Sequence, residues 1–384
     1  MNLHKAAHQW ATRPPEERFW TLEDLQTKSQ RHRLEALELN APPTLAVRAT
    51  DDGDLSLHSP HSGRTALLSN FSFDQLSALA GAPSHYLRRL PAPLASQCLN
   101  RGLEGRSEEG KRPLKLLLNQ NGDLRLRAIT SDQYVRLWND GIVDRLLELQ
   151  TEGWKVPPAR PQNASAPTRI ATERDVLNCR HAHLGVKAGY QIAPAGIYAS
   201  DRDLFCFMVD DQRPIEAGGT VLYRGFFVEN SEVGDRAFRL TAFLFNAVCG
   251  NHIVWGCTHL SEARIVHRGQ IRAKSAQQFE IELRKYGEAA TEHEAQVIES
   301  ARRRILAENK DDLITKLFRI KLAPKETLEQ AYAMAEEHPE DHGHSDPKSA
   351  WGFSNGLTRL SQRLEYTSDR VALDRAASQV LAMN

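Results

Sequence analysis

The chain has 384 residues, of which 41% are hydrophobic and 26% are charged, and its 49 basic residues are balanced by 49 acidic ones. This length and composition are ordinary for a globular protein with a sizeable core in one or two domains. A formal net charge of zero excludes a protein whose whole surface is drawn to a polyanion by bulk electrostatics.

The chain also lacks the usual signals of membranes, export and well-known cofactors. No apolar run approaches the ~18 to 20 residues of a membrane span, and residues 1–5 lack the apolar core of a signal peptide. The five cysteines form no paired framework, which favours reduced thiols. No phosphate-binding or dinucleotide glycine motif is present. We therefore expect a cytoplasmic protein with no membrane partner and no cofactor, more readily a non-enzyme than an enzyme.

The first 155 residues are predicted to form an N-terminal α+β region. Residues 1 to about 40 are predicted to be helical and amphipathic, with Thr21 as an N-cap. The turn formers Asp51-Asp52-Gly53-Asp54 lie between two short apolar runs and indicate a hairpin. Short helices are expected from Ser72 and after Pro91.

The clearest local prediction is a basic β-hairpin over residues 114–127. Two apolar runs meet at Asn121-Gly122, which suits the positive φ angles of a type I′ turn. Lys115, Arg125 and Arg127 stand on these strands, and the two-residue period places Arg125 and Arg127 on one face. Residues 88–136 carry ten basic side chains against five acidic ones. After the hairpin, Ser131-Asp132 is expected to cap a helix that runs to about residue 152.

Beyond a proline-rich linker at residues 157–167, the sequence predicts a β-rich core at 168–272 and a helical C-terminal region at 273–384. Phe226-Phe227-Val228 indicates a strand that ends in turn formers, and we favour a second, antiparallel strand over a buried helix for residues 238–245. The predicted fold class is α+β, with an antiparallel β core and flanking helices, and the three regions could form one composite domain.

Several phrases of the sequence resemble a known family. Tyr-Arg-Gly-Phe-Phe-Val-Glu-Asn-Ser-Glu-Val-Gly at residues 223–234 and Val-Cys-Gly-Asn-His-Ile-Val-Trp-Gly at 248–256 are similar to the phage/plasmid-related family known as domain of unknown function 932. Further similar segments lie at residues 11–19, 87–91, 200–203 and 367–371. The resemblance implies a mobile-element or prophage setting and assigns no biochemical activity.

Cationic side chains on rigid strands predict a surface that follows a nucleic acid, with a single strand favoured. Arginines and lysines would neutralise phosphates and a phenylalanine ring would stack on a base, although core packing is the ordinary role of such a ring. We expect a non-enzymatic accessory protein in recombination or DNA maintenance, similar in outline to single-strand annealing proteins and able to form a homo-oligomer. The candidate contact residues are Lys115, Arg125, Arg127, Arg224, Phe227 and Arg239.

Two other functions stay open. A metal-dependent enzyme acting on nucleic acid could hold Mg²⁺ through carboxylates at strand ends, and its candidate ligands are Asp201, Asp203, Glu229 and Glu232. Turn-forming acids explain these positions more simply. A host-defence antagonist that binds another protein is the second alternative. The zinc-like set Cys249, His252, Cys257 and His259 has spacing unlike that of known knuckles, and a strand explains it better.

Overall fold

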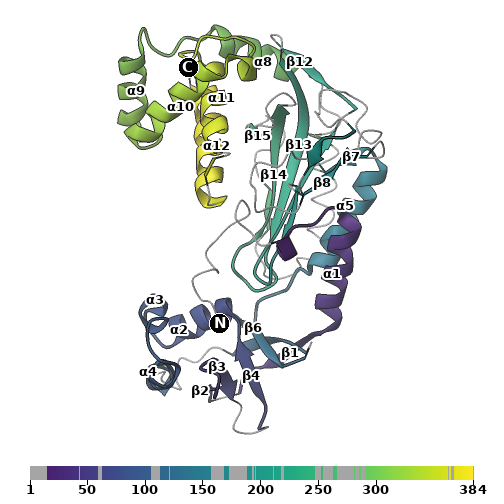
Figure 1. Ribbon diagram of the computed structural model, residues 1–384, viewed down its shortest axis with the longest axis vertical. Helices are drawn as coiled ribbons and strands as arrows, with labels where there is room; N and C mark the ends of the chain where they lie inside the picture. The colour runs from purple at the N-terminus through teal and green to yellow at the C-terminus, as the bar shows by residue number, and fades with distance from the viewer. Residues whose placement is uncertain are drawn as a thin grey trace.

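The computed structural model describes three parts of the molecule, which lie one after another along its long axis (Figure 1). A smaller sheet built from the N-terminal residues occupies one end, a larger sheet the middle, and a group of C-terminal helices the other end. The α+β fold class is therefore confirmed. The residues described are 15–42, 44–58, 63–104, 113–120, 122–156, 168–172, 188–192, 194, 196–210, 212–217, 220–246, 252–253, 263–265, 281, 285–286, 291–361, 363–364 and 367–383.

The N-terminal sheet has the strand order β1-β5-β6-β4-β3-β2. Its neighbouring strands pair antiparallel, except that β4 and β6 are parallel. The predicted hairpins at residues 51–54 and 114–127 are confirmed, and Gly122 in the second turn has a φ of 72°. The strands are β1 (Ala36–Asn40), β2 (Ala46–Ala49), β3 (Leu55–His58), β4 (Thr65–Leu68), β5 (Leu114–Asn119) and β6 (Arg125–Ser131).

Short helices cover one face of this sheet. They are α2 (Asn70–Leu79), α3 (Ser84–Leu87) and α4 (Ala92–Glu104). Phe73 and Leu99 from these helices share a buried cluster with Leu118 and Leu126 of the hairpin. The side chain of Asn100 on α4 also closes the outer edge of β2, because it accepts a hydrogen bond from the Val47 N–H at 2.7 Å and donates one to the Val47 carbonyl at 2.8 Å.

The central sheet is the core of the molecule, and every strand pair that its described residues form is antiparallel. The favoured strand at residues 238–245 is confirmed. The main strands follow the order β10-β11-β13-β14-β15, with β7, β12 and β16 added at their sides. They are β7 (Trp154–Lys155), β10 (Ile197–Ala199), β11 (Leu204–Asp210), β12 (Ile215–Ala217), β13 (Thr220–Asn230), β14 (Phe238–Asn246), β15 (His252–Ile253) and β16 (Ala263–Ile265); β8 (Arg169–Ile170) and β9 (Gln191–Ile192) pair separately.

Both faces of the central sheet are apolar. Successive side chains along a strand point to opposite faces, so its aromatic residues are divided between the two. Helices α1 (Leu22–Leu34) and α5 (Asn139–Thr151) cover one face, where Leu25 and Leu146 pack with Phe226. Phe227 points to the other face and packs with Phe207 and Phe243. Two helices from the first 155 residues thus contribute to the core of the central sheet. A 3₁₀ turn, η2 (Pro15–Glu17), precedes α1.

Helix α1 begins as predicted but ends at Leu34, and residues 36–40 form strand β1 where the sequence predicted a helix. The start of α5 also differs from the prediction. The Thr21 hydroxyl accepts a hydrogen bond from the Asp24 N–H at 3.1 Å, which confirms the predicted cap. The predicted start of α5 at Ser131-Asp132 is wrong, because β6 continues through Ser131, which pairs with Leu114. The helix begins only at Asn139 and has no side-chain cap from its own segment.

The C-terminal region is helical, as expected, and α11 lies at its centre. Trp351, Phe353 and Leu357 of this helix are completely buried among residues of the other helices and of the central sheet. The helices are α8 (Thr291–Arg303), α9 (Lys310–Arg319), α10 (Lys325–Glu337), η5 (Pro339–His342), α11 (Ala350–Ser361) and α12 (Thr367–Ala382). None of the described helices is both long enough and apolar enough to cross a membrane.

Two helical glycines give a test of this packing. A Cβ at Gly356 of α11 would lie 2.1 Å from the Ala331 carbonyl oxygen of α10, whereas a Cβ at Gly141 of α5 meets nothing within 4 Å. We expect Gly356→Ala to destabilise the protein by about 1–3 kcal/mol through overpacking. Gly141→Ala should stabilise it by roughly 0.5–1 kcal/mol, since alanine has the higher helix propensity. Urea unfolding of both variants measures the difference, and equal shifts would contradict the α10–α11 contact.

Candidate functional site at the junction of the two sheets

The turn after β13 inserts a buried carboxylate between the two sheets. Glu232 is 2% exposed, and its Oε2 accepts a hydrogen bond from Arg127 Nη2 at 3.0 Å. Its Oε1 accepts one from the Asn139 N–H at 2.9 Å, at the first residue of α5. A carboxylate is favourable there because the N–H groups of a helix N-terminus carry partial positive charge. Glu232 therefore supplies the cap that the local sequence of α5 lacks.

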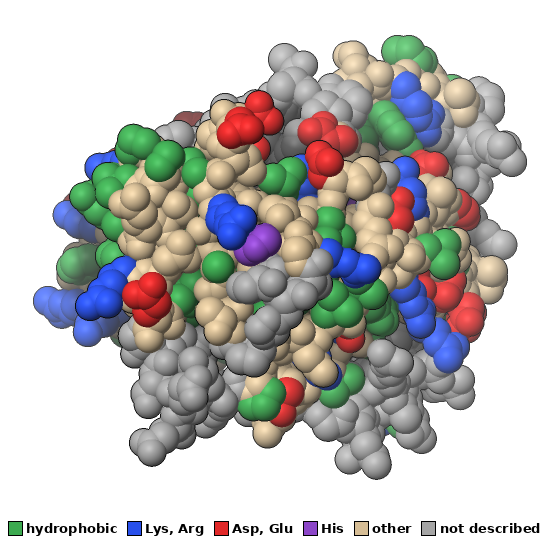
Figure 2. Space-filling view, turned by 90° about the horizontal axis from the view of Figure 1, so that it is seen from below, with side chains coloured by type: hydrophobic (Ala, Val, Ile, Leu, Met, Phe, Trp, Pro, Cys, Tyr) green, Lys and Arg blue, Asp and Glu red, His purple; other side chains and the backbone are tan. Residues whose placement is uncertain are grey.

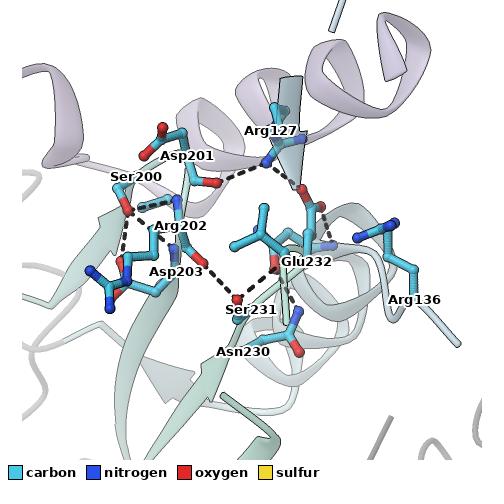
Figure 3. A network of polar contacts seen from close by, with 12 residues as sticks. Arg127, Arg136, Ser200, Asp201, Arg202, Asp203, Asn230, Ser231 and Glu232 are labelled. Carbon is cyan, nitrogen blue, oxygen red and sulfur yellow. Dashed lines mark hydrogen bonds and ion pairs between the residues drawn. The ribbon is translucent and has the colours of Figure 1, made fainter. Parts of the chain in front are cut away.

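A β-bulge in β6 brings Arg127 to this carboxylate. Leu117 of β5 pairs with Ala128, and the next residue, Leu118, pairs with Leu126. Arg127 is thus an extra residue in β6 with no partner on β5, and such a residue can be re-aimed by the local bend. Arg125 is exposed whereas Arg127 is 4% exposed, so the two arginines do not form one exposed basic surface. Figure 3 shows Arg127 reaching Glu232 and the main-chain oxygen of Asp201, which lies 3.1 Å from Nη2.

Other polar contacts fix the same turn. Ser231 Oγ donates to the Arg202 carbonyl at 2.7 Å, and the Tyr134 hydroxyl donates to the Ser231 carbonyl at 2.9 Å. The Asn230 amide donates to Asn139 Oδ1 at 2.8 Å. The segment Asn-Ser-Glu that the sequence presents as a polar turn is therefore fully buried and joins α5, β6 and the 200–203 loop.

The six predicted contact residues do not form one continuous surface. Arg224 is 1% exposed and forms an ion pair with Glu294 of α8 at 2.9 Å. Phe227 is 5% exposed and lies 5.2 Å from the Phe207 ring. These two side chains and Arg127 are buried, so they do not contribute to a nucleic-acid-binding surface. Arg239 is partly exposed but pairs with Glu229 at 3.2 Å. Of the six, only Arg125 is exposed, while Lys115 is half-buried.

The candidate metal ligands are brought to one end of the central sheet, where arginines separate them. Arg236 lies 3.6 Å from Asp203 and 3.2 Å from Glu229, and Glu229 also contacts Arg239. Asp201 is exposed and offers its main-chain oxygen, and not its carboxylate, to Arg127 (Figure 3). Among the residues that the structure describes, no group of three or more His, Cys, Asp or Glu side chains is arranged to hold a metal ion. Cys249, Cys257 and His259 lie outside the described residues.

Contacts between opposite charges outweigh burial at Asp235 and at Arg236 in this network. Burial alone would raise the pKa of Asp235, but its hydrogen bond to Arg202 at 2.9 Å and the charges of Arg202 and Arg236 together lower that pKa. Burial would lower the pKa of Arg236, but Asp203 and Glu229 together raise it. A network of matched ions suits positioning of the turn better than proton transfer, because each charge is stabilised by a neighbour.

A group of basic residues lies on α1 close enough to Arg127 to feel its charge, and sequence reasoning missed it. Lys28, Arg31 and His32 stand at helical spacings of three and four, which place them on one side of the helix. Burial, followed by the charges of Arg127, Lys28 and Arg31, lowers the pKa of His32 to about 3. Lys28 Nζ donates to the Glu16 carbonyl at 3.1 Å. The i, i+3, i+4 spacing was visible in the sequence, but the contact with Arg127 was not.

The buried Arg127–Glu232 pair generates a stability prediction. Glu232→Ala leaves the Arg127 charge buried without its partner and removes the α5 cap, so we expect a loss of about 3–5 kcal/mol in the free energy of unfolding. The double variant Arg127→Met with Glu232→Leu should recover much of that loss, since neither charge is then buried. Urea unfolding of the single and double variants measures this. A double variant as unstable as Glu232→Ala would show that the pair is not the source of the effect.

The depressed pKa of His32 predicts a pH dependence. The unfolded chain binds the His32 proton near pH 6.5 and the folded chain only near pH 3, so stability from this group is complete above pH 6.5 and is lost as the pH falls toward 3. We expect the unfolding free energy of His32→Gln to fall less steeply than that of the wild type across this window. The exposed His85 on α3 provides the matched control, His85→Gln. The prediction is contradicted if the unfolding free energy of His32→Gln falls with pH as steeply as that of the wild type.

Comparison with known proteins assigns the chain to a family but does not assign it an activity. No curated protein and no solved structure matches the chain. A family model described as a domain of unknown function, number 932, matches residues 170–378, which is more than half of the chain. The match includes the central sheet from β10 to β16, the buried turn at Glu232 and the C-terminal helices up to most of α12. The chain therefore belongs to the family of domain of unknown function 932.

Proposed function

We propose that this protein binds nucleic acid, a single strand in preference to a duplex, without making or breaking bonds in it. Its setting is the cytoplasm of a cell that carries a phage, plasmid or other mobile element, where it assists recombination or DNA maintenance. The observation that carries the proposal is a pair of exposed arginines on one face of the N-terminal sheet, Arg48 and Arg125.

The register of the sheet places these two arginines in one row. Arg48 pairs with Ser56, Ser56 with Leu67, and Leu67 with Arg125. Residues opposite one another on adjacent strands point to the same face, so Arg48 and Arg125 project together, three strand spacings or about 14 Å apart. Their face is opposite the one that α2 and α4 cover, because the alternate residues Val47 and Leu126 pack against those helices. Within the described part of the chain, neither arginine has an ion-pair partner.

The distribution of charge favours a flexible ligand. Figure 2, which looks at the end of the molecule formed by the N-terminal sheet, shows basic side chains in separate groups with acidic ones between them. Duplex DNA is stiff over about 50 nm and presents its phosphates at fixed positions. A single strand can bend to bring successive phosphates to separated cations.

Weak binding by one copy is compatible with this role if several copies act together. Two or three phosphate contacts give a modest, salt-dependent affinity. Copies joined in a homo-oligomer would bind one strand with a much higher apparent affinity, because each further contact is then intramolecular. A homo-oligomer is therefore part of the proposal.

Anisotropy of a labelled single-stranded oligonucleotide, measured across a salt series, tests the proposal. We expect Arg48→Ala with Arg125→Ala to weaken binding and to reduce the magnitude of the slope of log K against log salt by about 1.4, or roughly 0.7 for each lost phosphate contact. Arg101→Ala is the matched control, because Arg101 is an exposed arginine on α4, which covers the opposite face.

Three outcomes contradict the proposal in different ways. Unchanged binding by the double variant would place the interface elsewhere. Cleavage of the strand that appears only with Mg²⁺ would favour a metal-dependent enzyme. Absence of any salt-sensitive binding by the wild type would favour a protein that acts by binding another protein.

A further inference from the structure

We infer that α1 and the bulge of β6 form a separate anion site that takes a phosphate group, with Arg127 at its base and Arg31 and His32 at its rim. This site does not share residues with the Arg48 and Arg125 row, and the inference does not depend on the proposed function. The phosphate could belong to a free ion, a nucleotide or the end of a strand, since the recognising chemistry is the same.

The first support is the unused donor capacity of Arg127. Its side chain is 4% exposed, and its Nη2 atom donates to Glu232 Oε2 and to the Asp201 carbonyl. The Nε and Nη1 atoms are shielded from solvent and have no hydrogen-bond partner among the described residues. Buried polar atoms are bonded in the great majority of native structures, so unused donors on a buried guanidinium point to a missing acceptor.

The second support is the charge that surrounds His32. The groups close enough to act on the imidazole are Arg127, Lys28 and Arg31, and all three are cations that lower its pKa. The nearby acids Glu17, Asp201 and Glu16 act on Lys28 instead. Figure 3 shows the Asp201 carboxylate turned away from the Arg127 guanidinium. Glu232 occupies only Nη2 of Arg127, and Glu35 lies 3.9 Å from Arg31, so an oxyanion beside the imidazole would still meet donors that these acids leave unused.

The third support is a route to solvent. His32 is only partly buried and has no hydrogen-bond partner in the described part of the chain. Arg31 is 62% exposed, and its Glu35 contact is long, at 3.9 Å. A phosphate entering beside the imidazole would meet Arg31 first.

A phosphate group matches the arrangement of Arg127, Arg31 and His32 better than a carboxylate does. A phosphate group has three oxygens that accept bonds from different directions and a charge of about −1.5 to −2 near neutral pH when it is a monoester. Arg127, Arg31 and His32 approach from the sheet and from the helix, and arginine is the side chain best adapted to phosphate oxygens. A bound anion would also raise the pKa of His32, because it favours the protonated ring.

The test uses the full-length protein with ¹⁵N-labelled histidine and inorganic phosphate as the probe, at constant ionic strength. The His32 ring signals, assigned by their absence in His32→Gln, should shift saturably with phosphate, and the pKa of His32 should rise. Arg31→Ala should weaken phosphate binding about tenfold or more, since a charge-assisted contact is lost. Arg33→Ala is the control, because Arg33 lies in the same helical turn but pairs with Asp140 at 2.6 Å.

A second variant guards against loss of folding. Arg127→Gln combined with Glu232→Gln removes both charges of the buried pair and should abolish saturable binding while the protein stays folded. A 5′-phosphorylated and a 5′-hydroxyl oligonucleotide then show whether a strand end is the source of the phosphate.

The inference fails if the His32 shift is linear in phosphate and equal to that with chloride, or if both variant proteins bind phosphate like the wild type. Arg48→Ala with Arg125→Ala should bind phosphate normally, which separates failure of this site from failure of the nucleic-acid interface.

Discussion

A buried charge must be matched where it lies, and this constraint on Glu232 organises the junction of the two sheets. The carboxylate can be buried because Arg127 of β6 and the first N–H of α5 both donate to it. These donors come from the N-terminal sheet and from a helix that packs on the central sheet. Correct placement of the turn after β13 therefore requires both sheets to be formed. The turn lies within the family match, which begins at residue 170, but the two groups that donate to Glu232 lie before that residue.

Local patterns were sufficient to predict most of the secondary structure. The hairpin of β5 and β6, the Thr21 cap and the strand at residues 238–245 each follow from neighbouring residues. The start of α5 and the direction of Arg127 do not, because their causes lie about ninety to a hundred residues away in the chain. A two-residue period assumes an unbroken register, and the bulge breaks it at the residue that the junction needs.

The candidate site was the least predictable part for a related reason. A sequence shows that Arg224 is a cation on a strand, but it does not show that its ion-pair partner is Glu294 of α8, 70 residues further along the chain. Exposed and buried arginines look alike until their partners are known. The neutral overall composition was the one available hint that many of these charges are paired internally. The cluster around His32 required the position of α1 against β6, which no local pattern contains.

The side chain of Asn100 also affects how the protein behaves at high concentration. An edge strand with free N–H and C=O groups can pair with the edge of another molecule and begin an aggregate. By bonding both main-chain groups of Val47, Asn100 occupies the central hydrogen-bonding position of the short strand β2. A strand from another molecule would have to displace this amide before it could add there. The small sheet is thereby protected from uncontrolled growth on the side of β2 by one side chain.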